Sequence, residues 1–447
     1  MRRSTLVLAA AISAAALTVP AVAGAGTAPG YPAPENPAGG EAKPKGPFRT
    51  LRVSKRADGA YRTIQRAVNA ARPGDTIRVA DGTYREGLIV RGASKRYVKL
   101  LGNATKPERV VLEGQGLRGR TAQNGVWVNG AAGVMVRGFK ARNFRSNGFL
   151  VTNQTGYTFD ELIAERDGAY GLYAFNTKGG TISDSLAYFH NNAGFYVGQT
   201  PPQPRPVRTI VRNVTSWGNV IGFSGTNMRY VTITGSEWFN NGIGIVPNAL
   251  DSEKYAPPEE NVIRDNDIYW NNFNYYAGAP FTLRRGVTGK VDYPVGTGLL
   301  LFGGRGHIVE GNRFFGNYLV GAGALQQLLL EQKDAADLRR NEMRDNAFGL
   351  DGTDANGRDL FYDGNGTGNC FSGNTGVVRT VPADGSTFAP CPFTGANAFN
   401  SAAQGEAVGW ALEADREKFW VRVTHPAREG ITPLERFQRG RVYGPTK

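Results

Sequence analysis

One segment of the chain, residues 273–296, carries side chains of the kinds needed to cleave an acidic sugar polymer. Its candidate catalytic residues are Arg284, Arg285, Lys290, Asp292 and Tyr293. An elimination at a uronate needs a cation beside the carboxylate, a base for the C5 proton and an acid for the leaving oxygen, and these residue types can supply all three. Because any solvated loop contains similar residues, a structural interpretation stands beside the catalytic one.

Three aromatic residues occupy equivalent positions in a sequence repeat and are candidates for binding a sugar. Trp127, Tyr173 and Tyr196 are all expected to point outward from one sheet. Aromatic rings offer an apolar face for stacking, and tryptophan and tyrosine add a polar group. The alternative is that residues 26–47 or the C-terminal tail cover these rings.

The sequence contains no clear metal signature. Its three histidines, His190, His307 and His425, are scattered, so copper or zinc chemistry is not expected. Residues 363–368 read Asp-Gly-Asn-Gly-Thr-Gly, the first half of a calcium loop, but the twelfth position is Asn374 rather than glutamate. We therefore expect a turn there and no cofactor, with calcium binding as the alternative.

A repeat of 23 residues organises the middle of the chain. A glycine followed by an apolar strand recurs at this interval at Gly125, Gly148, Gly171 and Gly194. Later anchors follow with insertions, at Gly222, Gly244, Gly298, Leu328 and Gly349. Asparagines mark the corners, at Asn153, Asn176, Asn213, Asn266, Asn312 and Asn341. Strands this short cannot stand alone, so neighbouring coils must stack with their strands about 4.8 Å apart.

The alternation within each anchor strand predicts which side chains face outward. The expected outward residues are Trp127, Leu150, Tyr173, Tyr196, Ser224, Val246, Leu300, Leu329 and Asp351. From Gly244 to Gly298 the chain uses 54 residues where one coil needs 23, and the surplus falls in residues 248–260 and 273–296. Long insertions are often functional, and these would wall a groove over the outward strip.

The first part of the chain adds a second pattern. Residues 61–86 contain Thr63-Ile-Gln-Arg-Ala-Val, Ala70-Ala, Pro73-Gly-Asp-Thr-Ile and Gly82-Thr-Tyr-Arg-Glu. Apolar residues at helical spacing predict a capping helix over residues 61–72. Together with the coils that follow, this run resembles the right-handed parallel β-helix proteins of the pectate-lyase-like superfamily, over residues 48–370. The resemblance implies an all-β fold of about ten coils, with substrate along the outer face of the first sheet.

The resemblance is specific for the fold and not for a chemistry. Lyases of the superfamily use an arginine or lysine base with calcium-binding acids on the first sheet, and the outward positions before Asp351 carry neither. The paired aspartates of polygalacturonases, the later motifs of pectin methylesterases and the Asp-Pro-His of mannuronan epimerases are also missing.

The remaining segments indicate an exported chain. Residues 1–25 have the positive start, apolar stretch and small-residue cleavage site of a signal peptide. Residues 26–47 are a Pro/Gly-rich linker, and residues 371–447 should form the C-terminal cap and tail. Cys370 and Cys391, an even pair in an exported chain, predict a disulfide bond. We expect a secreted, extracellular monomer with no membrane segment after signal cleavage.

Charge suggests a partner. The formal net charge is +14, and residues 43–120 hold 19 lysines and arginines against six acids. Such a patch attracts anionic polymers in a salt-dependent way, although it could equally serve solubility. Export argues against nucleic acid. The sequence predicts a carbohydrate-active protein that binds a polysaccharide, which could be acidic, along the first-sheet groove, and that could cleave it as a lyase or glycoside hydrolase. The alternative is a non-catalytic wall or matrix protein that docks on an anionic polymer.

Overall fold

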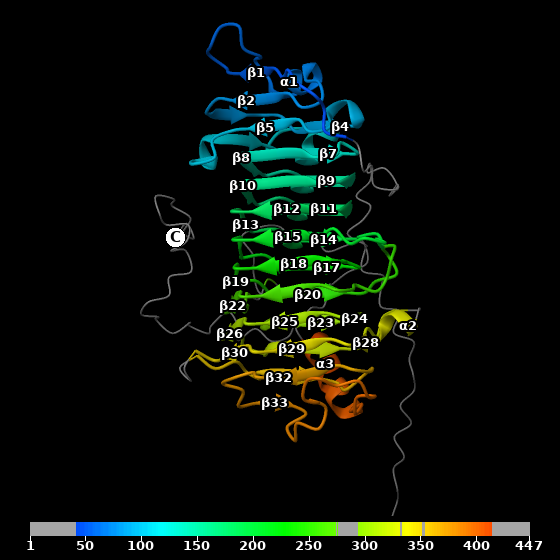
Figure 1. Ribbon diagram of the computed structural model, residues 1–447. Coiled ribbons are helices and arrows are strands. Elements are labelled where there is room, and N and C mark those ends of the chain that lie inside the picture. Colours follow the sequence, from blue (N-terminus) through cyan, green and yellow to red (C-terminus); the bar gives the residue numbers. More distant parts are fainter. Residues whose placement is uncertain (1–41, 274, 276–293, 331–332, 351–353, 414–447) are drawn as a thin grey trace, which may run out of the picture.

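The computed structural model describes residues 42–273, 275, 294–330, 333–350 and 354–413. They form an elongated stack of coils, with the N-terminal coils at one end and the C-terminal coils at the other (Figure 1). Eleven parallel strands form the first sheet, and a 20-stranded sheet wraps around the other two faces. The structure is thus the predicted parallel β-helix, with eleven turns in place of about ten.

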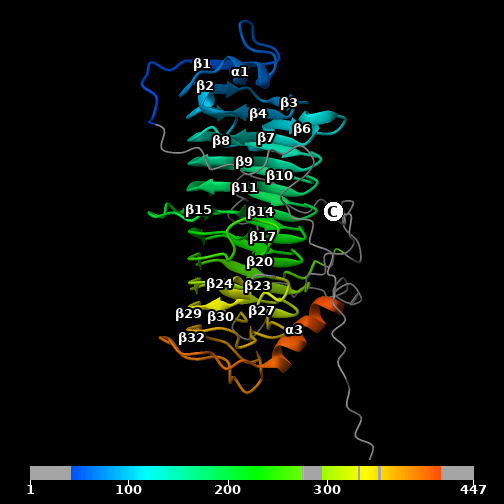
Figure 2. The same cartoon turned by 90° about the vertical axis from the view of Figure 1, so that its right-hand side faces the viewer.

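The first sheet faces the viewer in Figure 2. Its strands are β4 (Leu88–Arg91), β7 (Asn124–Asn129), β9 (Asn147–Thr155), β11 (Tyr170–Lys178), β14 (Ala193–Gly198), β17 (Ile221–Thr226), β20 (Ile243–Asn248), β23 (Thr297–Phe302), β27 (Val320–Leu325), β31 (Leu360–Tyr362) and β33 (Thr380–Val381). Inward residues such as Val126, Phe149, Leu172 and Phe195 are fully buried in the main core. The hydrophobic effect therefore fixes the register of each strand.

The second face of the stack carries twelve strands. They are β1 (Thr50–Val53), β2 (Thr76–Val79), β5 (Lys99–Leu101), the first halves of β8 (Val134–Arg142) and β10 (Tyr157–Glu165), β12 (Gly180–Ser183), β15 (Thr209–Arg212), β18 (Val231–Thr234), β21 (Val262–Arg264), β25 (Ile308–Glu310), β29 (Glu342–Arg344) and β32 (Cys370–Ser372). A small pair, β24 (Gly304–Arg305) and β28 (Leu338–Arg339), lies apart.

The third face combines the second halves of β8 and β10 with eight shorter strands. These are β3 (Gly82–Tyr84), β6 (Val110–Glu113), β13 (Leu186–Tyr188), β16 (Thr215–Trp217), β19 (Glu237–Phe239), β22 (Asp267–Tyr269), β26 (Arg313–Phe315) and β30 (Ala347–Phe348). Five outward rings on consecutive coils stack within 15° of parallel, from Tyr188 through Trp217, Phe239 and Tyr269 to Phe315. Their ring centroids are 4.7 to 6.5 Å apart.

Helices lie near both ends. The predicted capping helix is confirmed as α1 (Ile64–Ala70), where Thr63 is the N-cap and Ile64, Ala67 and Val68 are buried. Near the other end, α3 (Ser401–Glu413) packs on the outer face of the first sheet, with Trp410 against Phe361. A short α2 (Lys333–Ala336) lies between β27 and β28. Among the described residues, no helix is long and apolar enough to span a bilayer.

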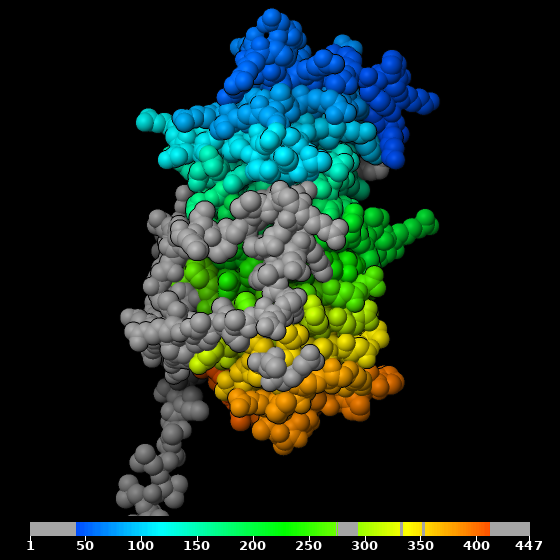
Figure 3. All heavy atoms as spheres, turned by 90° about the vertical axis from the view of Figure 1, so that its left-hand side faces the viewer, coloured from blue at the N-terminus to red at the C-terminus, as the bar shows by residue number. Residues whose placement is uncertain are grey.

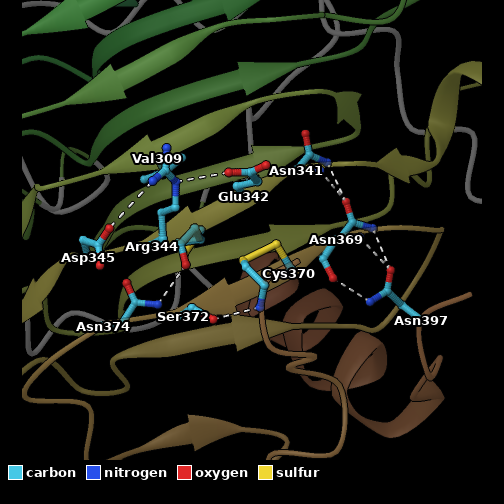
Figure 4. The surroundings of a disulfide bond; sticks show 12 residues. Val309, Asn341, Glu342, Arg344, Asp345, Asn369, Cys370, Ser372, Asn374 and Asn397 are labelled. Carbon is cyan, nitrogen blue, oxygen red and sulfur yellow. Dashed lines mark hydrogen bonds and ion pairs between the residues drawn. A yellow bond between two sulfur atoms is a disulfide. The ribbon is translucent and has the colours of Figure 1, made fainter. Parts of the chain in front are cut away.

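The predicted disulfide bond is confirmed. Cys370, on β32, is joined to Cys391, and the two Cα atoms are 4.9 Å apart (Figure 4). The bond ties the chain that follows the last coil back onto the second face. Next to it, the Arg344 guanidinium pairs with the carboxylates of Glu342 and Glu310 at 3.1 and 2.8 Å.

The outward positions are as predicted from Trp127 to Leu300, but the last two were wrong. Gly321 follows Gly298 at the regular interval of 23, so the next strand is β27 and its outward residue is Gly323. The apolar run at Leu328 lies in a turn, where Leu329 is 46% exposed. In the following coil, β31 places Phe361 at the position expected for Asp351, which lies outside the described residues.

Ladders of side-chain amides run along the corners inside the stack. In each ladder, the backbone N–H of one rung donates to the side chain of the next, to an oxygen or, at a histidine, to Nδ1; between consecutive asparagines the distance is 3.0 to 3.3 Å. One ladder consists of Asp167, His190, Asn219, Asn241, Asn271, Asn317 and Asn356. A second contains Asn266, Asn312, Asn346 and Asn374, and a third contains Asn261, His307, Asn341, Asn369 and Asn397.

Asp167 occupies a position where later coils have asparagine. The Phe144 N–H donates to its Oδ1 at 2.9 Å, while its Oδ2 has no hydrogen-bond partner in the described part of the chain. In the asparagine rungs the corresponding amide nitrogen donates to a backbone carbonyl, as Asn241 does to Ser216 at 3.0 Å. Burial raises the pKa of Asp167 well above its ordinary value. The residue therefore fits the ladder as a neutral acid.

We expect Asp167→Asn to raise the free energy of unfolding near neutral pH by about 1–3 kcal/mol, because the amide satisfies the ladder without holding a proton. The gain should shrink as the pH falls to about 4, since a raised folded-state pKa destabilises the fold only above the unfolded value of about 3.9. Chemical denaturation across this range measures both effects. Asn241→Asp, the reverse change, should destabilise; an Asp167→Asn variant no more stable than the parent at neutral pH would contradict the assignment.

His307→Asn should protect the fold against acid. Burial lowers the folded-state pKa of His307 to about 3, so below about 6.5 the unfolded state binds the proton first. The parent then loses about 1.4 kcal/mol per pH unit from this residue until the folded pKa is reached. An asparagine matches the neighbouring rungs Asn261 and Asn341. Unfolding midpoints from neutral to acid pH should fall less steeply for the variant, and parallel curves would count against this account.

Candidate functional site

The three predicted sugar-binding aromatics lie on one face of the stack. Trp127 on β7, Tyr173 on β11 and Tyr196 on β14 all point outward from the first sheet. They are only 5%, 3% and 1% exposed. With Tyr170, Leu150, Val246, Tyr275, Val295 and other apolar residues they form what we call the first-sheet cluster. The rings are therefore buried in this conformation.

Three tyrosines form the centre of this cluster. The ring centroids of Tyr170, Tyr173 and Tyr196 are 4.6 to 4.9 Å from one another. Trp127 lies nearer the N-terminal end, where its indole N–H donates to Thr152 Oγ1 at 3.0 Å. Tyr170 was not among the predicted residues, although its place directly before the anchor Gly171 is a usable signal.

A carboxyl group from an inserted loop reaches this centre. Glu253 lies in the loop of residues 249–260 that follows β20, is 4% exposed, and its Oε1 accepts a hydrogen bond from the Tyr196 hydroxyl. Its Oε2 has no hydrogen-bond partner among the described residues. Burial raises the pKa of Glu253 to about 8, and burial followed by the nearby Glu253 charge raises the pKa of Tyr196. At neutral pH the carboxyl is thus mostly protonated.

Polar contacts hold the 249–260 loop in place. The Asn227 side-chain amide donates to the carbonyls of Leu250 and Glu253, both at 2.8 Å. The Lys254 N–H donates to Gln199 Oε1 at 2.9 Å. Farther along the loop, Glu259 pairs with Arg229 at 3.1 Å. The sequence indicated this insertion by its length but gave no sign that Glu253 would point inward.

The five predicted catalytic residues Arg284, Arg285, Lys290, Asp292 and Tyr293 lie outside the described residues. Their assignment stays a prediction. The described end of the same insertion places Tyr275 and Val295 in the first-sheet cluster, both almost fully buried. The insertion therefore reaches the aromatic strip, as its position between β22 and β23 requires.

The positions considered for metals are used by the protein itself. Asp363 accepts hydrogen bonds from the Asn365 and Gln326 N–H groups, both at 3.0 Å, as expected of a turn. Asn374 is a ladder rung. Across the ranges that the structure describes, no three His, Cys, Asp or Glu side chains gather as a metal site.

Exposed positive charge covers the first coils, which are blue in Figure 3. We define the N-terminal basic surface as the lysines and arginines of residues 43–120 that are exposed and form no ion pair with a described residue. They are Lys43, Lys45, Arg52, Lys55, Arg56, Arg66, Arg72, Arg78, Arg85, Arg91, Lys99, Lys106, Arg118 and Arg120. Arg52 on β1 lies directly opposite Arg78 on β2, its neighbour in the parallel sheet. Arg91 is the last residue of β4 in the first sheet.

Comparison with known families agrees with this architecture. The sequence model of one family, described as periplasmic copper-binding protein (NosD), matches residues 101–320, just under half of the chain. The chain is a right-handed parallel β-helix protein. The described residues do not fit a copper site, because His190 and His307 are buried ladder rungs whose Nδ1 atoms accept from backbone N–H groups.

Several solved structures are similar to this β-helix protein. A rhamnogalacturonan lyase is 13% identical, with a TM-score of 0.40 and coverage of 74% of this chain and 84% of that chain. Pectate lyase Pel9A is 15% identical, with a TM-score of 0.39 and coverages of 74% and 78%. The catalytic domain of a GH87 α-1,3-glucanase is 12% identical, with a TM-score of 0.43 and coverages of 80% and 70%. No curated protein gave a significant match.

Tyr173→Ala should destabilise the β-helix protein by about 3–5 kcal/mol, because the ring is buried against Tyr170, Phe175 and Tyr196. Denaturant unfolding measures the loss. Tyr318→Ala is the control, since that ring is 38% exposed and its removal should cost less than about 1 kcal/mol. Equal losses in the two variants would show that the first-sheet cluster is not a packed unit.

Proposed function

We propose that this β-helix protein is exported and binds an anionic polysaccharide at its N-terminal basic surface. The observation that carries the proposal is the set of fourteen exposed cations without described ion-pair partners on the first coils. Cations that no carboxylate neutralises keep their full attraction for an external anion. The disulfide bond fits an exported protein, and it makes polymers outside the cell the relevant anions.

The geometry of the coils favours a repeating polymer. Strands of neighbouring coils are about 4.8 Å apart, so outward residues such as Arg52 and Arg78 recur along the axis on a rigid scaffold. Along the axis of the stack, the first-sheet strand that carries Arg91 is followed by the strands that carry Trp127, Tyr173 and Tyr196. We propose that a bound polymer continues onto this strip, where the aromatic rings would stack on sugars once they are uncovered.

A second candidate function is cleavage of the polymer, as a lyase or a hydrolase. Glu253 favours it, because a carboxyl that keeps its proton at neutral pH and lies against a tyrosine hydroxyl suits a general acid. New reducing ends would support hydrolysis, and unsaturated products would support elimination. If neither product forms from an acidic polymer that the protein retains, the non-catalytic binding function stands alone.

Removing two charges from the basic surface should weaken retention on an anionic polysaccharide. We expect Arg52→Gln/Arg78→Gln to lower affinity about five- to thirtyfold at low salt, taking about 0.5–1 kcal/mol for each exposed charge. Affinity chromatography on an acidic and a neutral polysaccharide measures the effect.

The matched control is Arg212→Gln/Arg264→Gln, which removes the same charge from the same outward row of the second face. It should retain nearly full affinity. Equal weakening in both variants would mean that only net charge matters, and binding that high salt leaves unchanged would overturn the electrostatic proposal.

A further inference from the structure

The 249–260 loop reaches Tyr196, at the centre of the first-sheet cluster, through one inserted side chain. Its residues Asp251, Ser252 and Lys254 are exposed, whereas Glu253 between them is buried with its carboxyl on the Tyr196 hydroxyl. No residue of the loop belongs to the first-sheet cluster, so apolar packing contributes little to its closure there. Polar contacts, with Glu253 at their centre, hold the loop against the tyrosines.

Glu253 is buried, and among the described residues no cation balances a negative charge on it. The titratable and charged groups around it are Tyr170, Tyr173 and Tyr196 on the sheet, Asp251, Lys254, Tyr255, Glu259 and Glu260 on the loop, and Arg229 and Arg305 beyond it. Arg229 and Arg305 instead face Glu259, at 3.1 and 3.9 Å. No described residue forms an ion pair with Glu253, and its Oε2 has no hydrogen-bond partner in that part of the chain.

Ionisation of Glu253 therefore conflicts with the closed loop. An uncompensated carboxylate buried beside the Tyr196 ring is strongly unfavourable. The tip of the loop, residues 250–254, is otherwise held by hydrogen bonds between its backbone groups and the side chains of Asn227 and Gln199, which water can replace. The two ends of the loop stay anchored to the stack, where Gln327 bonds to the Ala249 carbonyl and Arg229 pairs with Glu259. The least costly response is for the tip of the loop to lift and carry Glu253 into water, which uncovers Tyr196 while the ends of the loop stay anchored.

We propose that the 249–260 loop is a proton-linked lid over a sugar-binding platform formed by Tyr170, Tyr173 and Tyr196. The lid is closed while Glu253 keeps its proton and open when Glu253 is ionised. The lid goes beyond the proposed function, whereas the ligand of the platform, a sugar of the bound polysaccharide, rests on it. Opening exposes Tyr196 first, and its ring centroid lies 4.9 and 4.7 Å from those of Tyr170 and Tyr173, on the sheet to which Arg91 also belongs.

Hydrogen exchange of the full-length protein tests the lid without any ligand. After correction for intrinsic exchange rates, protection of residues 250–256 should fall about tenfold between about pH 6 and pH 7 and level off above about pH 8, where Glu253 is ionised in the closed loop as well, while the core strands stay protected. Glu253→Gln keeps an acceptor for Tyr196 and cannot ionise, so its lid should stay protected at both pH values. Glu260→Gln, on the same loop and exposed, should behave as the parent does.

The outcomes separate the lid from the ligand. Equal protection of the parent loop at both pH values, or the same loss in Glu253→Gln, would overturn the lid. Tryptic cleavage after the exposed Lys254 is a second measurement and should accelerate with pH more in the parent and in Glu260→Gln than in Glu253→Gln. A uronate oligosaccharide added at neutral pH should lower the protection of the loop. If pH opens the lid and the oligosaccharide does not, the tyrosines are not the sugar-binding platform, while retention on the basic surface is judged separately.

Discussion

The hydrogen-bonding demand of the buried corners governs the rest of the structure. Water cannot reach a corner inside the stack, so its backbone groups must be satisfied by the next coil. Asparagine meets this demand because one amide both accepts from a backbone N–H and donates to a carbonyl. The bond from Asn266 spans 46 residues of sequence and the bond from Asn346 spans 28, yet both are 3.1 Å long. Insertions are therefore forced outward, between rungs.

The outer faces of the coils consequently carry whatever distinguishes this protein. On the third face, stacked rings from Tyr188 to Phe315 cover one another. On the first sheet, the 249–260 loop covers the middle strands and α3 covers the last ones. The first coils differ, because their outward positions hold unpaired cations instead of apolar groups. A ligand can therefore bind that surface without a conformational change in the protein. Binding at the aromatic strip requires a conformational change that exposes the rings.

The features that could be predicted from the sequence are the core strands and the asparagines at the corners. The glycine interval placed the first-sheet strands as far as Leu300, and Asn266 and Asn312 are ladder rungs as expected. The prediction failed at Leu328, because a strongly apolar run concealed the regular anchor Gly321. Asn213 bonds to Asp184 and is not a rung of these ladders.

Burial of the outer face could not be predicted in the same way. Alternation shows which face Trp127 occupies, but not whether another segment covers it. Glu253 was missed for a related reason, since a glutamate in a polar loop ordinarily indicates solvent. Its inward position depends on contacts with Tyr196, which is 57 residues away in the sequence. Such long-range contacts leave no local pattern.

The same physical rule links the ladders to the lid. Asp167 and His190 are adjacent rungs that burial holds in their neutral forms, and their effects on stability have opposite signs. As the pH falls from about 6.5 to 4, the depressed pKa of His190 costs stability while the raised pKa of Asp167 restores it. Deep in the stack, neither charge can escape, so the cost falls on global unfolding. Glu253 has the same conflict under a surface loop, where local movement is open to it, and so the same rule yields a conformational response instead.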